Sequence, residues 1–251
     1  MIRYKIKNSL TLISLLSLTL LITSCGSNSS GSGSGSSSSS SSSSLSSSEG
    51  TYSILDYFPL SVGFKAVIKH TYNGETKYIS SYIDSTTTID GKNAFVRKFY
   101  NQDGTLLETN YEYVDASGYY EYIRECGGWI KLYPGQFSVG DTYTFNKQCS
   151  FDSEQVDISY QVTVLGEEQV STPLGSFPAL KIKRVITYNS DSFNVQEILY
   201  TYAVKGIGGI LSYGYNSEDN SDESEEVVYL EINNKTYGSM NNIPDYVITP
   251  W

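Results

Sequence analysis

Apolar and polar side chains alternate with a period of two residues through most of this chain, from residue 51 to residue 232. Residues 64–72 show the alternation clearly, and Asn73-Gly74 directly after them is typical of a tight β-hairpin turn. Asp90-Gly91 and Asp103-Gly104 repeat that turn signal. No stretch after residue 50 combines a helical period with helix caps. The pattern therefore predicts antiparallel strands joined by short turns.

The 23 tyrosines support this prediction, because aromatic and β-branched residues favour strands. We expect one all-β domain over residues 51–251, folded as an antiparallel sandwich or as an open curved barrel. The expected strands cover residues 64–72, 77–84, 94–100, 105–114, 119–125, 129–133, 142–146, 156–165, 179–188, 193–203, 210–215 and 227–232.

The degree of closure decides whether such a domain has a pocket. A closed sandwich fills its interior with the side chains of Phe64, Ile68, Phe95, Phe99, Leu180, Ile182 and Ile198. Incomplete closure leaves some of them lining a groove for a lipid-like or aromatic ligand. We favour closure, since most β domains of this size fill their cores.

The N-terminus has the layout of an export signal. Arg3, Lys5 and Lys7 precede an apolar run over residues 10–22, which is too short for a comfortable transmembrane span. Leu21-Ile22-Thr23-Ser24-Cys25 closes the run and resembles the lipobox of bacterial lipoproteins. The resemblance implies that residues 1–24 are removed and that Cys25 carries lipid, palmitate among its acyl groups, which anchors the protein to a membrane. The alternatives are an uncleaved anchor helix and a signal cut elsewhere.

Residues 25–50 contain the expected lipidated cysteine and an almost pure Ser/Gly segment, which we expect to be a disordered tether. Gly26 stands where enterobacterial lipoproteins retained at the inner membrane carry Asp. By that resemblance we expect a cell-envelope protein at the outer membrane rather than the inner membrane, facing the periplasm or the cell surface.

Three segments of the β region resemble a recurrent pattern of uncharacterised bacterial envelope lipoproteins. They are Phe58-Pro-Leu-Ser-Val-Gly63, the turn and strand start at 173–181, and Tyr202-Ala-Val-Lys-Gly-Ile-Gly208. These proteins are distantly similar to curved-sheet folds such as the lipoprotein-localisation factors, so the resemblance implies a curved sheet. The aromatic residue that usually follows the first Val-Gly is absent, since Ala66-Val67 stands there.

The cysteines predict one disulfide. With Cys25 used by lipid, Cys126 and Cys149 remain as an even pair in an exported, oxidising context. Two free thiols are the alternative. We expect no metal site, because two cysteines and a single histidine, His70, do not make a zinc shell.

Tyrosine pairs two residues apart place two rings on one face of a strand. Tyr111 with Tyr113 and Tyr200 with Tyr202 are candidate ligand-face aromatics for a glycan or a peptide. Cross-strand tyrosine ribs that stiffen the sheet are the alternative reading of the same pattern.

Charge and missing motifs narrow the function. The formal net charge is -10, and loss of the three cations before residue 25 makes it -13, which excludes nucleic acid as a partner. The densest acidic run, at 218–226, is expected to be a solvated hairpin tip. A nucleophile elbow and a cofactor loop are absent from the sequence, so we expect no enzymatic activity, no catalytic residue and no cofactor.

The prediction is therefore a non-enzymatic cell-envelope lipoprotein, held to the membrane through Cys25, whose β-domain binds an apolar, glycan or protein ligand or serves a structural interaction. The alternative is a glycan-directed envelope hydrolase that uses carboxylates.

Overall fold

A computed structural model describes residues 50–151, 154–218 and 220–251. The predicted signal peptide, Cys25 and the tether up to residue 49 lie outside the described residues, and predictions about them stay predictions. Within the described ranges, no helix is long and apolar enough to cross a membrane.

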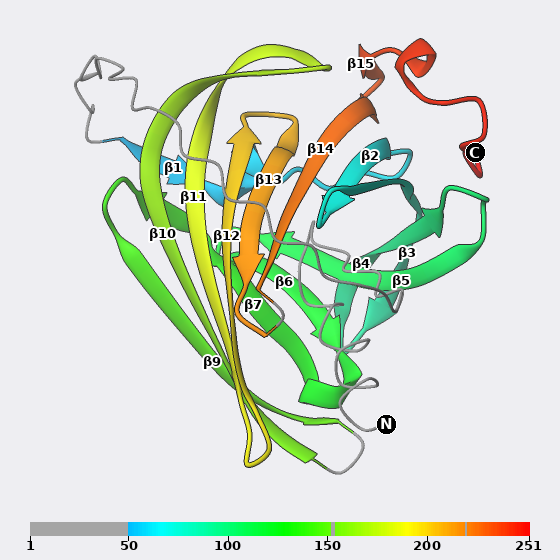
Figure 1. The fold of residues 1–251 in the computed structure, drawn as a ribbon. Coiled ribbons are helices and arrows are strands. Elements are labelled where there is room, and N and C mark those ends of the chain that lie inside the picture. The colour runs from blue at the N-terminus through cyan, green and yellow to red at the C-terminus, as the bar shows by residue number, and fades with distance from the viewer. Residues whose placement is uncertain (1–49, 152–153, 219) are drawn as a thin grey trace, which may run out of the picture.

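The described residues form a single, almost entirely antiparallel β-domain, which confirms the predicted fold class (Figure 1). Its main sheet curls into a nearly closed, barrel-like shape with strand order β7-β6-β5-β4-β3-β2-β14-β13-β12-β11-β10-β9. These strands are β2 (Lys65–Tyr72), β3 (Glu75–Ile89), β4 (Lys92–Asn101), β5 (Leu106–Asp115), β6 (Gly118–Ile123), β7 (Gly128–Pro134), β9 (Thr142–Phe151), β10 (Glu154–Thr172), β11 (Gly175–Asn189), β12 (Asn194–Val204), β13 (Gly208–Asn216) and β14 (Ser221–Ile232). A short strand, β15 (Lys235–Gly238), pairs with β14, and the 3-10 helix η3 (Met240–Asn242) follows it.

Local chemistry explains the hairpins. At the turn between β2 and β3, Asn73 and Gly74 both have positive φ, 48° and 81°. Asp90 and Gly91 do the same between β3 and β4, at 50° and 75°. Asn, Asp and Gly tolerate this left-handed conformation, which two-residue hairpin turns require. The period of two then sends alternate side chains inward, as in β11, where Ile182 and Ile186 are buried.

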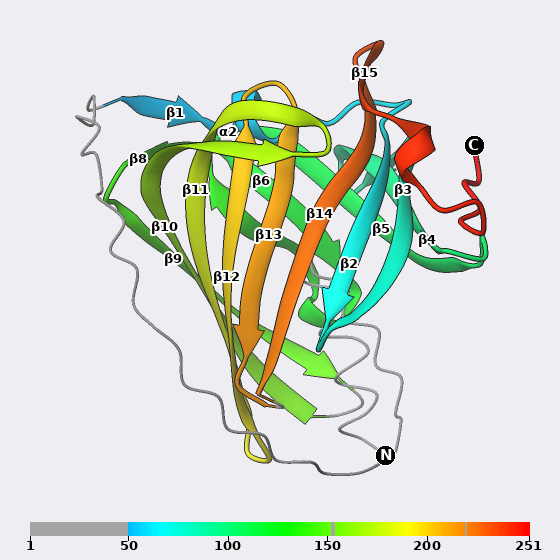
Figure 2. The ribbon, with the colours of Figure 1, turned by 45° about the horizontal axis from the view of Figure 1, so that its top comes forward.

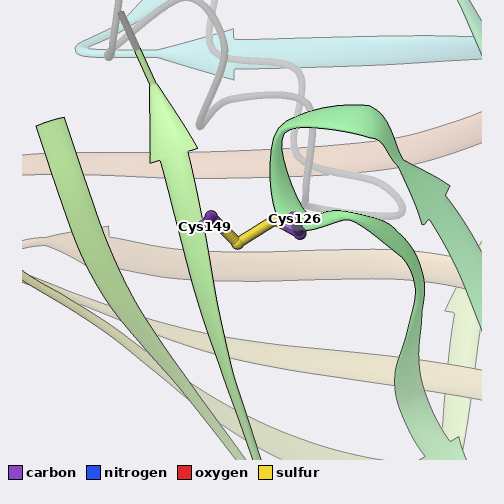
Figure 3. The surroundings of a disulfide bond; sticks show 2 residues. All are labelled: Cys126 and Cys149. Atoms are coloured by element: carbon purple, nitrogen blue, oxygen red, sulfur yellow. A yellow bond between two sulfur atoms is a disulfide. The ribbon is translucent and has the colours of Figure 1, made fainter. Parts of the chain in front are cut away.

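A disulfide joins the two ends of the strand order. Cys126 lies in the 3-10 helix η2 (Arg124–Cys126) between β6 and β7, and Cys149 lies on β9. Figure 3 shows the bond between the η2 loop and β9. Strand β9 lies against β7 and η2, but no ladder pairs β7 with β9 among the described strands. The disulfide therefore closes the sheet where backbone hydrogen bonds do not.

A segment that we call the strap, residues 51–60, covers one end of the barrel-like sheet (Figure 2). It contains β1 (Thr51–Ser53), which pairs with β8 (Gln136–Ser138), and the one-turn helix α2 (Ile54–Tyr57). Ile54 and Phe58 are buried. The turn between β12 and β13 holds the strap from outside: Gly206 N–H donates to the Asp56 backbone oxygen at 2.6 Å, and Lys205 Nζ lies 3.0 Å from its carboxylate.

The β10–β11 hairpin is longer than the sequence predicts. The expected strand start at residue 179 is too late, because β11 begins at Gly175, and Pro178 lies inside it and pairs with Gln169. The ladder between β11 and β12 begins at Leu180. Before that residue, one side of β11 has no paired strand among those described. A proline without N–H is tolerated on such an edge. The hairpin changes register between Val164 and Gly166, and β10 contacts β14.

The interior is largely apolar. Four of the predicted core side chains, Ile68, Phe99, Leu180 and Ile182, are buried. Phe64, Phe95 and Ile198 are only partly buried. Closure is thus nearly complete, and a small cavity remains beside Phe64.

Candidate functional site

A cavity of about 60 Å³ lies inside the sheet beneath the strap. Since one ordered water needs about 10–15 Å³ measured in this way, the cavity has room for a few waters or for a small organic group. Its wall is formed by Phe58, Pro59, Leu60, Phe64, Ala66, Ile68, Ser81, Arg97, Phe99, Tyr119, Tyr133, Arg184, Ile207, Gly208, Gly209, Val227 and Leu230. Most of these residues are apolar, and two arginines are the charged exceptions.

Arg97, on β4, is hydrogen-bonded to its neighbours. Its Nε donates to both carboxylate oxygens of Glu112, at 2.8 and 3.0 Å, and its Nη1 donates to Ser81 Oγ at 3.2 Å. The guanidinium carbon also lies 4.4 Å from the centre of the Phe64 ring. A buried charge is tolerated when it is paired and hydrogen-bonded in this way.

Arg184, on β11, lacks such partners. Only 1% of its surface is exposed, and its Nε and Nη1 atoms have no hydrogen-bond acceptor. Its guanidinium carbon lies 6.0 Å from the centre of the Tyr133 ring. Arg184 lies on the same face of β11 as the buried residues Ile182 and Ile186, so its side chain points into the interior. A guanidinium has five N–H donors and almost always finds acceptors when it is buried.

Three carboxyl groups lie near the arginines on β5 and β6. Glu112 and Glu121 face each other across the ladder and are 0% and 2% exposed. Burial, with the charges of Glu108 and Glu112, raises the pKa of Glu121 well above its ordinary value. Burial likewise raises the pKa of Glu108 to about 8, with a smaller contribution from Glu112. Burial therefore favours the neutral form of Glu121, and Glu108, with a pKa of about 8, is mostly neutral at pH 7.

The predicted aromatic residues do not meet. Glu112 and Leu199 point inward, so Tyr111, Tyr113, Tyr200 and Tyr202 lie on the opposite face of β5 and β12. These two strands are far apart in the strand order.

Tyr113 belongs to one aromatic cluster. It pairs with Tyr120 across the ladder, contacts Trp129, and has Lys92 Nζ 4.4 Å from its ring centre. No ring contact is recorded for Tyr111 among the described residues.

Tyr200 and Tyr202 belong to a second cluster. Tyr200 stacks on Tyr213 at 5.2 Å, and the two are partners in the ladder. Tyr202 is 7% exposed, and its hydroxyl donates to Glu168 at 3.2 Å. Both clusters contain tyrosines paired across neighbouring strands, as expected for rings that stiffen the sheet. A role of these tyrosines in ligand binding stays a prediction.

The cysteines and the single histidine were the other candidate residues. Cys126 and Cys149 are buried in the disulfide, and Cys25 lies outside the described residues. His70 is 2% exposed, with its Nδ1 3.5 Å from Glu225 Oε1 on the facing strand. Within the described ranges, no three His, Cys, Asp or Glu residues gather to hold a metal ion.

The sequence reasoning missed the charged cluster of Arg97, Glu112, Glu121 and Arg184. A signal for two of its members was present: Arg184 interrupts the apolar positions 182 and 186, and Glu121 interrupts positions 119 and 123. A charge in the inward register of a strand marks a buried polar site.

Comparisons with known proteins concern the fold. No family model and no curated protein sequence matches this chain. A proposed lipoprotein from Parabacteroides distasonis ATCC 8503 aligns with a TM-score of 0.48 and 14% identity, over 70% of this chain and 99% of the other. A proposed exported protein with a YmcC-like fold from Bacteroides fragilis NCTC 9343 aligns with a TM-score of 0.43 and 12% identity, over 70% and 99%.

The hypothetical lipoprotein YmcC from Escherichia coli K12 aligns with a TM-score of 0.34 and 12% identity, over 65% of this chain and 83% of the other. At such low identities and TM-scores, these likenesses carry no assignment of function.

Proposed function

We propose that this chain is an exported lipoprotein of the cell envelope, anchored by lipid on Cys25, whose β-domain binds an apolar ligand in its interior and catalyses no reaction. The anchor is supported by the cations at residues 3–7, the apolar run at 10–22 and the lipobox-like 21–25. The Ser/Gly segment that follows provides a tether between membrane and domain. An outer-membrane location is supported by Gly26 after the cysteine.

The cavity beneath the strap is the observation that supports binding. Its wall is mostly aliphatic and aromatic, and two guanidinium groups supply the charge. Small-molecule sites in proteins have this composition, with apolar walls and a few polar groups that orient the ligand. Phe58 and Leu60 of the strap form part of the wall. Movement of the strap would therefore open the cavity at the end of the sheet that the strap covers.

The hydrolase alternative needs two carboxyl groups that reach a sugar. Glu112 and Glu121 are buried, and neither is part of the cavity wall. Glu112 is held by Arg97 through two hydrogen bonds. This arrangement favours the binding proposal. Release of sugars from envelope glycans by the wild type, with loss of that activity in both Glu112→Gln and Glu121→Gln, would favour the hydrolase instead.

Metabolic labelling with palmitate tests the anchor. We expect label in the wild type and none in Cys25→Ser. The matched control is Cys126→Ser, which removes a cysteine from the β-domain and should still be labelled. Equal labelling of the wild type and Cys25→Ser would overturn the anchor proposal.

Native mass spectrometry tests the ligand proposal on protein purified from its own envelope fraction. We expect a bound small molecule that is released on unfolding. A clean apo mass, together with no thermal shift across apolar compounds, would refute interior binding and leave the anchor proposal standing.

A further inference from the structure

We propose that the ligand of the cavity is a short apolar monocarboxylate and that its carboxylate is held by Arg184. The inference rests on the proposed function, the binding of an apolar ligand in the interior, and names the chemical class of that ligand.

Arg184 has unused hydrogen-bonding capacity. Its Nε and Nη1 are buried without an acceptor, and the residue lines the cavity. The other arginine of the wall, Arg97, already donates to Glu112 and Ser81. A carboxylate accepts charge-assisted hydrogen bonds from a guanidinium, and these are about twice as strong as neutral ones. Arg184 is thus the charged group of the wall with donors left for a ligand, and the Tyr119 hydroxyl is a neutral donor on the same wall.

The buried charges of the cluster favour an anion beside Arg184. The Arg97 guanidinium is matched by the carboxylate of Glu112. Burial favours the neutral forms of Glu108 and Glu121. Among the described residues, no carboxylate accepts a hydrogen bond from Nε or Nη1 of Arg184, so its buried positive charge lacks a counter-charge in direct contact with these atoms, which is costly. A ligand with one negative charge corrects the balance, whereas a phosphate monoester with two would reverse it.

The lining and size of the cavity favour a short apolar chain. The residues that surround the arginines on the wall are apolar, among them Ile68, Phe99, Val227 and Leu230. An apolar chain attached to the carboxylate would bury its surface against them, at about 25 cal/mol per Å² removed from water. The volume of about 60 Å³ limits the chain to a few carbon atoms while the strap stays in place. The competing explanation is that ordered waters occupy the cavity and satisfy Arg184.

Calorimetric titration of the intact, lipid-anchored protein in phosphatidylcholine nanodiscs separates these explanations, with empty nanodiscs as the blank. The probes are butanoate, 1-butanol and butyl phosphate, which share one short chain that fits the volume limit and differ in the head group. We expect butanoate to bind at least tenfold more tightly than either other probe. Arg184→Gln should weaken butanoate binding at least tenfold, while Arg124→Gln, a change at an exposed arginine of η2, should leave it unchanged.

The outcomes are distinct. Equal binding of butanoate and 1-butanol, insensitive to Arg184→Gln, overturns the carboxylate inference but leaves interior apolar binding intact. Tighter binding of butyl phosphate also overturns it. Binding of none of the three overturns both the inference and interior binding, and waters then satisfy Arg184. Should Arg184→Gln fail to fold, the comparison of head groups on the wild type decides alone.

Discussion

Glu108 should make the folding stability of this protein depend on pH in an unusual direction. The residue lies on β5, and its Oε1 is buried without a hydrogen-bond partner. Burial is the main cause that raises the pKa of Glu108 to about 8, and the charge of Glu112 adds to it. A hydrogen bond from Asn110 acts in the opposite sense and is outweighed.

The sign follows from proton linkage. Between pH 4.5, the ordinary pKa value, and pH 8, the folded state keeps a proton on Glu108 that the unfolded state has lost. The free energy of unfolding therefore falls as the pH rises through this window. Each pKa unit corresponds to about 1.4 kcal/mol, so the full loss on passing pH 8 is about 5 kcal/mol, of which about 3 kcal/mol is reached at pH 7. Most carboxyl groups of folded proteins act in the opposite direction.

Urea denaturation at several pH values from 5 to 8 measures this effect. Glu108→Gln keeps the shape of the protonated side chain but cannot ionise, so its stability should exceed that of the wild type by a margin that grows with pH. We expect about 3 kcal/mol at pH 7 and about 1 kcal/mol or less at pH 5. Glu125→Gln, at an exposed glutamate of η2, is the matched control. Its free energy of unfolding should change with pH in parallel with that of the wild type. Parallel curves for Glu108→Gln and the wild type over the whole range would refute the reasoning.

Three further perturbations test the architecture. Replacing both Cys126 and Cys149 by Ala opens a loop with a sequence separation of 23 and should cost about 3 kcal/mol of unfolding free energy in non-reducing urea denaturation; unchanged stability contradicts this expectation. Phe58→Ala removes a buried strap ring that stacks on Tyr133 at 4.5 Å, and calorimetry should show a loss of about 3–5 kcal/mol, whereas a loss below about 1 kcal/mol would mean that the strap does not pack in solution as described. Gly135→Ala would place the new Cβ atom 1.8 Å from a backbone oxygen of the β5–β6 turn. As in overpacked cores, the free energy of unfolding should fall by about 2 kcal/mol or more, and the melting temperature should fall with it. A melting temperature equal to that of the wild type argues against this close approach.

The strand content was predictable because it depends on local signals. Period-two alternation and the Asn73-Gly74 and Asp90-Gly91 turns fix where hairpins begin and end, whatever lies across the sheet. Each stretch expected to be a strand overlaps a strand of the structure. The choice between a sandwich and a barrel-like sheet was not predictable in this way, since it depends on how the strands curl and on which ends approach each other.

Errors occurred where tertiary contacts override local composition. The acidic run at 218–226 has the composition of a solvated tip, yet β14 begins at Ser221 and Glu225 is 3% exposed. Its neighbour across the ladder is His70, which is also buried. Strands β1 and β8 were missed for a related reason: each has three residues, too few to show a period, and each is a strand because the other is next to it.

The charged cluster shows the limit of sequence reasoning most clearly. In Lys181-Ile182-Lys183-Arg184, three cations are close together, and only the parity of the buried apolar positions places Arg184 inside while the lysines remain partly exposed. Parity does not identify the neighbours of Arg184. Glu121 lies on β6, near the opposite end of the strand order from β11, and the charge of Arg184 acts on the pKa of Glu121 only because the sheet curls until its ends approach each other. The same closure brings Cys126 and Cys149 into one bond, so the disulfide and the approach of Glu121 to Arg184 share a cause, which the cysteine count alone does not reveal.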